Sequence, residues 1–224
     1  MLALPDEPRW IEAHGIDAAG DGWRESLGAR AFAIGHDATR LVVIADATDA
    51  DPDAIVALVR RRASHGLLFA PELAPVIARA GRVPQRAVLH ALSDPTALPD
   101  LDGATPLAPD APLDHLPAPL AAELAAARAR DQAIWAVYLD DQPVSFAYAP
   151  WRSPRWFDVS IDTLQSARQL GLGTIAAAAL VRAERAHGRE PVWGTDEHNA
   201  ASRALARRLG FLEIDELGVA APAP

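Results

Sequence analysis

The chain has 224 residues, of which half are apolar and 23% are charged, with a formal charge of −9 and a pI near 5.2. This composition can bury a sizeable core and excludes a largely disordered chain, and the acidic balance argues against a nucleic-acid partner, which requires a basic face. The absence of Cys excludes disulfides, thiolate metal sites and a cysteine nucleophile, and we expect no metal.

Residues 1–15 begin with a short apolar run that Pro5, Asp6, Glu7 and Pro8 interrupt at once. This pattern is neither a signal-peptide core nor a spanning helix. We therefore expect a cytoplasmic protein with no membrane partner.

The first third of the chain alternates strand and helix patterns. Residues 41–46 form an apolar strand-like run, and Asp51 and Pro52 follow in N-cap and first-turn positions, which predicts a helix directly after them. A strand over 65–69, a helix over 71–80 and a strand over 87–92 are predicted next.

A Pro-rich segment separates this region from the rest. Seven prolines fall between Pro95 and Pro119 without a sustained period, which predicts a loop or short-helix connection. We divide the chain into an α/β region over 1–85 and a second domain over 86–224. The first region is compatible with a packing subdomain, a dimerisation element or a degenerate half copy of the second fold.

The second domain again mixes both kinds of element. The predicted order is helix 120–130, a hairpin of strands 133–139 and 144–149, strand 156–163, helix 173–187, strand 191–194, helix 200–209 and strand 211–214. We expect an α/β fold with a mixed, mostly antiparallel sheet and helices on both faces. No internal repeat is visible in the sequence.

The segment between strand 156–163 and the following helix carries the most informative residues. Arg168 leads into Gly171 and Gly173, and the helix that follows presents unpaired N–H groups and the positive end of its dipole. The glycines let the backbone approach a ligand, and Arg168 adds a fixed positive charge. This arrangement predicts a diphosphate site.

Arg168-x-x-Gly171-x-Gly173 resembles the Q/R-x-x-G-x-G/A signature of the GNAT superfamily of acyl-CoA N-acyltransferases. The spacing of the last helix and strand is similar as well, over Asn199, Ser202, Leu205, Ala206, Gly210 and Phe211. The resemblance covers roughly residues 86–217, is strongest over 157–211, and implies a GNAT-like fold.

The resemblance implies acetyl-CoA, or another acyl-CoA, as co-substrate. In the family, backbone amides hold the diphosphate, which here implies Gln169, Leu170, Gly171, Leu172, Gly173 and Thr174. The pantetheine arm is expected against Ile161, Asp162 and Thr163. The sulfur is expected beside Asn199 and Ser202. The family usually ends with a further strand, so the final sheet is truncated here or completed from elsewhere.

The implied reaction is direct attack of an amine on a thioester, without the covalent intermediate that a Cys would form. We expect Asp158 or Asp162 to accept the proton, directly or through a water. Many family members protonate the thiolate with a Tyr at the position of Ala206, so Ser202 is the nearest candidate here. We expect a small-molecule amine as the acceptor, with a protein amine second, and a homodimer is compatible with the sequence.

Other interpretations remain open. The glycine pair is compatible with a plain tight turn, and Gly171-x-Gly173-x-x-Ala176 with Asp196 also fits a dinucleotide fingerprint, although that fold needs more strand–helix units after the acidic residue. Asp158 and Asp162 can be structural carboxylates, and Asn199 can be an N-cap.

The change at Ala206 also leaves room for a protein without catalysis. A non-catalytic acyl-CoA-binding or interaction module is the alternative function, and a purely structural domain is the third class. Only the structural domain predicts no thermal shift with acetyl-CoA.

Overall fold

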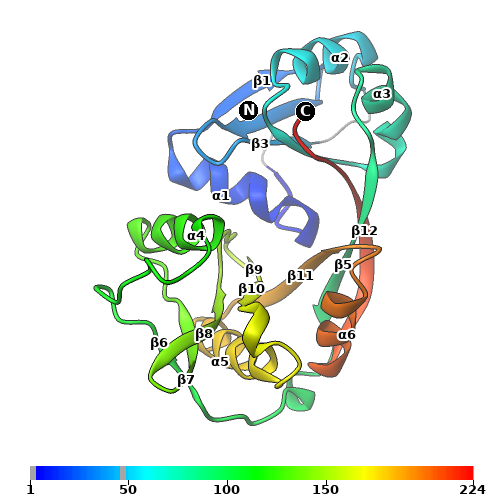
Figure 1. Ribbon diagram of the computed structural model, residues 1–224. Coiled ribbons are helices and arrows are strands. Elements are labelled where there is room, and N and C mark those ends of the chain that lie inside the picture. Colours follow the sequence, from blue (N-terminus) through cyan, green and yellow to red (C-terminus); the bar gives the residue numbers. More distant parts are fainter. Residues whose placement is uncertain (1–3, 46–48, 224) are drawn as a thin grey trace. The chain divides into compact units, whose positions relative to one another are not determined.

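The computed structural model describes residues 4–45 and 49–223, which form two compact units (Figure 1). Unit 1 contains the chain up to Leu89 together with Gly194–Asn199 and the segment from Glu213 onward. Unit 2 contains His90–Trp193 and Ala200–Leu212. Each unit is therefore discontinuous in sequence, whereas the sequence predicted two continuous domains meeting after residue 85.

Unit 1 is built from short helices around a sheet. Its elements are α1 (Ile11–Ala19), β1 (Trp23–Ser26), β2 (Phe32–His36), β3 (Leu41–Ala45), α2 (Pro52–Arg61), β4 (Gly66–Phe69), α3 (Ala74–Arg79) and β5 (Gln85–Leu92). The predicted elements from β3 to β5 are confirmed, except that Asp46 lies outside the described residues. Sequence analysis missed α1, β1 and β2.

The core of unit 1 lies between this sheet and its helices. β1, β2 and β3 are antiparallel, β3 and β4 are parallel, and β4 pairs with the end of a later strand, β12 (Phe211–Ala220). Ile55, Leu58 and Val59 place the apolar face of α2 against Ile44 and Phe69, and all five side chains are fully buried. The helical spacing seen in the sequence is what buries this face.

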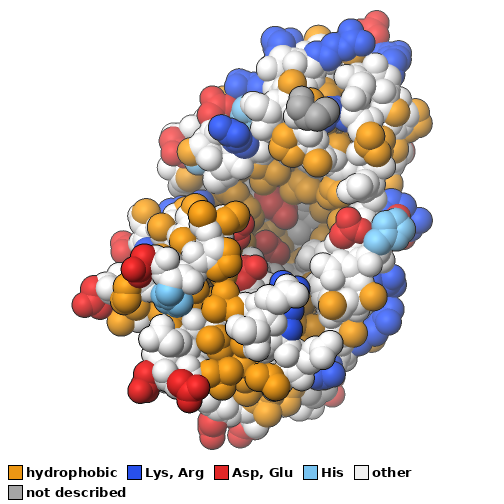
Figure 2. Space-filling model, in the orientation of Figure 1, with side chains coloured by type: hydrophobic (Ala, Val, Ile, Leu, Met, Phe, Trp, Pro, Cys, Tyr) orange, Lys and Arg blue, Asp and Glu red, His pale blue; other side chains and the backbone are white. Residues whose placement is uncertain are grey.

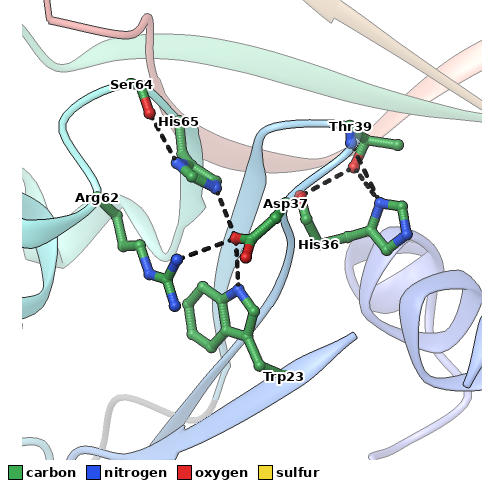
Figure 3. Close-up of polar contacts among 7 residues, drawn as sticks. All are labelled: Trp23, His36, Asp37, Thr39, Arg62, Ser64 and His65. Atoms are coloured by element: carbon green, nitrogen blue, oxygen red, sulfur yellow. Dashed lines mark hydrogen bonds and ion pairs between the residues drawn. The ribbon is translucent and has the colours of Figure 1, made fainter. Parts of the chain in front are cut away.

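Asp37 is hydrogen-bonded to residues from several elements of unit 1 (Figure 3). The carboxylate of Asp37, after β2, accepts hydrogen bonds from Trp23 Nε1 at 3.0 Å, Arg62 Nη1 at 2.9 Å and His65 Nε2 at 3.0 Å. The bonds from Trp23 and His65 are the main reasons that the pKa of Asp37 is lowered. Ser64 contacts the other ring nitrogen of His65, at 3.3 Å.

Unit 2 contains the longer helices and a second sheet. Its elements are β6 (Ala104–Pro106), α4 (Ala118–Ala129), β7 (Trp135–Leu139), β8 (Gln142–Tyr148), β9 (Trp156–Asp158), β10 (Ser160–Thr163), α5 (Leu172–Ala186), α6 (Ala200–Arg208) and parts of β5, β11 (Glu190–Asp196) and β12. The predicted hairpin is confirmed, with Asp140 and Asp141 both at positive φ, as a two-residue turn of this kind requires. The Pro-rich segment contains β6, which the sequence did not reveal.

Helices cover both faces of the antiparallel sheet β10-β8-β7-β6 (Figure 1). On one face, Ala176, Ala177 and Leu180 of α5 are fully buried in a cluster with Phe157 and Ala147. These alanines allow the helix backbone to approach the strands closely. On the other face, Leu120, Leu124 and Ala127 of α4 pack with Phe146 and Tyr148. The predicted mixed, mostly antiparallel α/β fold is confirmed.

The last strand is longer than predicted and has an unexpected neighbour. β12 runs to Ala220, and the hydrogen-bonded order of the larger sheet is β1-β2-β3-β4-β12-β5-β11-β9. β5, β11 and β12 contribute residues to both units. The sheet is therefore completed from elsewhere, as one of the two expectations had it, because β5 lies between β12 and β11.

No helix within residues 4–45 and 49–223 combines the length and apolar character needed to cross a bilayer. Figure 2 shows acidic and basic side chains over the visible face, with basic ones in the region of α2 and α3. The last turn of α2 carries Arg60 and Arg61, and Arg79 ends α3. Cations at the ends of helices are favourable because of the helix dipole.

Candidate functional site

The segment that enters α5 is shaped by two residues with left-handed backbone conformation. Gln169 has φ 65° and Gly171, the N-cap of α5, has φ 79°. No side chain caps this helix, and its first turn contains no acidic residue. Successive N–H groups in a turn with left-handed residues can point to one side, which is the geometry of an anion-binding concavity.

The backbone donors of this segment have no acceptor within the described residues. No such acceptor contacts the N–H groups of residues 169–173, whereas the N–H of Thr174 donates to Gly171 O at 3.0 Å. The Thr174 hydroxyl is buried and also lacks a partner in the described part of the chain. Buried polar groups are normally hydrogen-bonded. Residues 169–174, which we call the α5 mouth, therefore fit a ligand that brings several acceptor oxygens, as a diphosphate does.

The two glycines have different roles. At Gly171 a Cβ would meet no atom within 4 Å, so glycine is favoured there by its positive φ. A Cβ on Gly173 would lie 3.3 Å from Thr163 Oγ1 and 3.4 Å from Leu205 Cδ2, so this position must be small because α5 packs tightly against β10 and α6. Sequence analysis had assigned both glycines to close approach of a ligand.

The strand before the α5 mouth changes neighbours halfway along. β9 pairs with β11 in parallel, and the N–H of Val159 donates to Val192 O at 3.0 Å. β10 then pairs with β8 and forms the edge of its sheet. The predicted single strand 156–163 is therefore two strands, and β10, with Ile161, Asp162 and Thr163, presents an open edge of the kind an extended ligand can follow.

Asp158 lies at the point where the strand changes neighbours. Burial raises the pKa of its carboxyl to about 7, although the Val159 N–H opposes this shift. Its own N–H donates to Trp151 O at 3.0 Å, which fixes the backbone there. A carboxyl with a pKa near neutrality is suited to accept a proton at physiological pH.

Asp162 belongs to a polar group between β10, β8 and α4. Burial and the nearby charge of Glu123 raise its pKa, and the positive charge of Arg168 lowers it. The Tyr148 hydroxyl donates to Glu123 Oε2 at 2.9 Å and is bonded to Ser160 as well. Burial is the main reason that the pKa of Tyr148 is raised, so its phenol is neutral.

Sequence analysis missed Glu123, Ser160 and the hydroxyl of Tyr148 as parts of this group. In the sequence, Glu123 is one polar residue in an Ala-rich helix, 25 residues from Tyr148. The register of β10 on β8, which pairs Ser160 with Tyr148, is what brings the group together. The alternation over 156–163 was the only signal in the sequence for a polar face.

Arg168 and Ser202 both have partners within unit 2. Arg168 is exposed, and its Nε donates to Thr163 O at 3.2 Å, which places its charge beside β10. The Oγ of Ser202 accepts a hydrogen bond from Trp193 Nε1 at 2.9 Å. Ala206 is fully buried in the core, so a larger side chain at this position would require repacking. Asn199 belongs to unit 1, and its N–H donates to Asp196 O at 3.0 Å in the turn before α6.

The described residues contain no group of three or more His, Asp or Glu side chains placed to hold a metal ion.

Part of the chain is similar to a known protein family. Residues 135–219, which include the α5 mouth and the edge strand, match the family model of the GNAT acetyltransferases. Over these residues the chain is similar to the GNAT acetyltransferases. No match was found among curated protein sequences.

Solved GNAT structures resemble the whole chain. An acetyltransferase of this family from Novosphingobium aromaticivorans is 17% identical with a TM-score of 0.64, covering 98% of both chains. A GCN5-related N-acetyltransferase from Kribbella flavida is 19% identical with a TM-score of 0.65, covering 96% of this chain and 95% of its own. A tandem GNAT protein from the clavulanic acid pathway is 15% identical with a TM-score of 0.55, covering 100% and 97%. At these identities the likeness shows the fold, which is GNAT-like across the full chain.

Proposed function

We propose that this protein is an N-acetyltransferase of the GNAT type that moves an acetyl group from acetyl-CoA to an amine. The observation that carries the proposal is the mouth of α5, where five consecutive N–H groups and the buried Thr174 hydroxyl have no acceptor within the described residues. This mouth lies inside the segment that matches the family model.

The residues of unit 2 fit CoA along a continuous path. The amides of residues 169–173 and the Thr174 hydroxyl would hold the diphosphate, with Arg168 adding positive charge. The open edge of β10 would pair with the pantetheine arm, as an added strand does. When bound, the co-substrate supplies an activated acyl group.

Asp158 is the proposed proton acceptor. In the net reaction the amine nitrogen forms a bond to the acyl carbon, the carbon–sulfur bond breaks, the amine loses a proton and the thiol gains one. Above pH 7 the carboxylate of Asp158 is ionised and accepts the proton, because its raised pKa matches the working pH. Asp162 and Glu123 lie on the neighbouring strand and helix and contribute negative charge rather than proton transfer, and Tyr148 holds Glu123 through its neutral hydroxyl.

The acceptor class follows from that charge. The charge of Glu123 helps to raise the pKa of Asp162, as expected for like charges that lie close together. A cationic amine relieves this repulsion, so a small molecule with a second positive charge is the proposed acceptor, and a Lys side chain or protein N-terminus comes second.

Release of free thiol from acetyl-CoA tests the proposal. Three groups of acceptors of equal length are compared: diamines, monoamines without a second charged group, and amino acids that carry a carboxylate. We expect the highest kcat/KM for the diamines. Equal rates for all three groups would contradict the proposed acceptor class, and the absence of turnover together with tight acetyl-CoA binding would contradict the enzyme.

The alternative is a non-catalytic acyl-CoA-binding module, which the buried Ala206 favours because no general acid stands at that position. Saturable binding of acetyl-CoA without turnover of any amine would support the module.

A further inference from the structure

Unit 1 repeats the topology of the part of the chain that contains the α5 mouth. The order helix, three strands, helix, strand, helix, strand runs from α1 to β5 and again from α4 to β12, if β9 and β10 count as one strand broken at Val159. In each copy the three strands pair antiparallel. In each copy the third strand also pairs in parallel with the fourth, as β3 with β4 and β9 with β11. Order and pairing direction agree throughout, although no repeat is visible in the sequence.

The repeat makes α2 the counterpart of α5, and the two helices begin differently. The N-cap of α2 is Asp51, whose carboxylate accepts from the N–H of Asp53 at 2.9 Å. Pro52, the first helical residue, has no N–H to offer. At α5 the cap is Gly171, without a side-chain bond. The first two N–H groups of the helix, which are open at Leu172 and Gly173, are therefore missing at Pro52 and used at Asp53.

The segment before α2 is also bonded to the hairpin between β1 and β2. The N–H of Asp51 donates to Leu27 O at 2.7 Å. The carboxylate of Asp49 accepts from the N–H groups of Arg30 and Ala31, both within 3.0 Å at the shorter contact. A Cβ on Gly28 would lie 2.3 Å from Asp49 O, so the hairpin backbone packs directly against Asp49.

The charged residues at the starts of α2 and α5 lead to the same conclusion. Three aspartates, Asp49, Asp51 and Asp53, lie at the start of α2, and of these Asp53 has an ion pair with Arg79. The first turn of α5 has no acidic residue, and Arg168 precedes it. A diphosphate would be repelled at the first mouth and attracted at the second.

From these contacts we infer that unit 1 is a second copy of the same topology whose anion mouth is closed by its own aspartates, so that the chain binds one CoA and binds it at α5. The number of CoA molecules bound per chain, one, rests on the proposed function, whereas the closure of the α2 mouth does not. Unit 1 therefore keeps the topology of its counterpart and supplies β5 to the larger sheet, but it is not a second CoA site.

Ligand counting tests the inference. Calorimetry of the full chain with acetyl-CoA is expected to give one site per chain, and two sites would overturn the inference. Leu170→Glu places a charge on an exposed side chain of the α5 mouth without changing a left-handed residue, and should weaken binding roughly tenfold or more. Asp51→Ala is the matched variant at α2 and should leave the affinity at α5 within about twofold, because Asp51 does not belong to the α5 mouth. Strong binding that survives Leu170→Glu would overturn it.

Amide hydrogen exchange of the free protein tests closure without any ligand. The N–H groups of Arg30, Ala31, Asp51 and Asp53 should be protected, and those of residues 170–172 should exchange freely. If no CoA binds, the proposed function and the count of one fail, but this exchange pattern still decides the closure. Free exchange at Asp51 and Asp53 would contradict it.

Discussion

The third strand of unit 1 and its counterpart in unit 2 differ in how they are paired. β3 is an unbroken apolar strand that pairs with β2 over its whole length and with β4 on its other edge. In unit 2 the corresponding residues pair first with β11, as β9, and then with β8, as β10. One strand is therefore closed on both edges, while the other leaves an edge open beside the α5 mouth.

The difference in pairing is accompanied by a difference in the polarity of the side chains. Leu41–Ala45 contains no polar residue, and four of its five side chains are buried. Asp158, Ser160 and Asp162 alternate along the broken strand and are only partly buried. We expect β3 to contribute to stability and β9 and β10 to contribute to activity, and the following predictions are ordered by the size of the effect.

The largest effect is expected for Asp158→Asn. Loss of a proton acceptor should lower kcat by about 100-fold to 10,000-fold, because proton transfer by a positioned side chain contributes that much. The rise in activity near pH 7 should disappear as well, since the pKa of Asp158 is about 7. Steady-state thiol release between pH 5 and 9 measures both.

Asp162→Asn is the control for this variant. It should retain most of kcat and raise KM for cationic amines, because Asp162 contributes charge. The reverse pattern, with the rate lost in Asp162→Asn alone, would make Asp162 the proton acceptor.

Ile44→Ala in β3 should reduce the free energy of unfolding by about 2–5 kcal/mol, as expected for a fully buried Ile. It should leave KM for acetyl-CoA unchanged. Ile161→Ala in β10 removes a partly buried side chain that packs against the α5 core, so it should cost less stability and raise KM for acetyl-CoA. Denaturant unfolding and initial rates compare the two, and equal losses of stability would contradict the division of roles.

A pH-dependent gain of stability is expected for Asp158→Asn. The pKa of this carboxyl is raised in the folded state, so the wild-type protein loses stability as the pH rises from about 4 through about 7. The variant should gain at most about 4 kcal/mol above pH 7 and nothing below pH 4, since one pKa unit corresponds to about 1.4 kcal/mol.

Asp37→Asn should give the opposite sign. The pKa of Asp37 is lowered by its bonds to Trp23 and His65, so its contribution is present above its ordinary pKa and is lost as the pH falls. Urea midpoints of both variants at pH 4 and pH 8 measure these signs. A shift in the same direction for both would contradict the electrostatic explanation.

The smallest effect is expected for Asp51→Ala. Loss of an N-cap costs about 1 kcal/mol of stability. Activity with acetyl-CoA should not change, because the residue lies in the closed mouth. A thermal melt and a rate assay suffice, and a change in KM for acetyl-CoA would count against closure.

Sequence alone determined the local features of this protein. The N-cap at Asp51, the hairpin at Asp140 and Asp141, and the signature from Arg168 to Gly173 depend on neighbouring residues, so their residue types predict them directly. The same holds for the open mouth of α5, since Gly171 leaves the helix without a side-chain cap.

Only the tertiary structure decided the features that depend on distant segments. The position of β5 between β12 and β11, the change of neighbours at Val159 and the meeting of Glu123 with Tyr148 all join residues far apart in the chain. Hydrogen bonding between strands has no local sequence signal that names the partner, and the packing of Gly173 against Leu205 exists only once α5 and α6 are in place. The similarity of the two halves is a property of strand pairing, which very different sequences can satisfy when their buried faces agree.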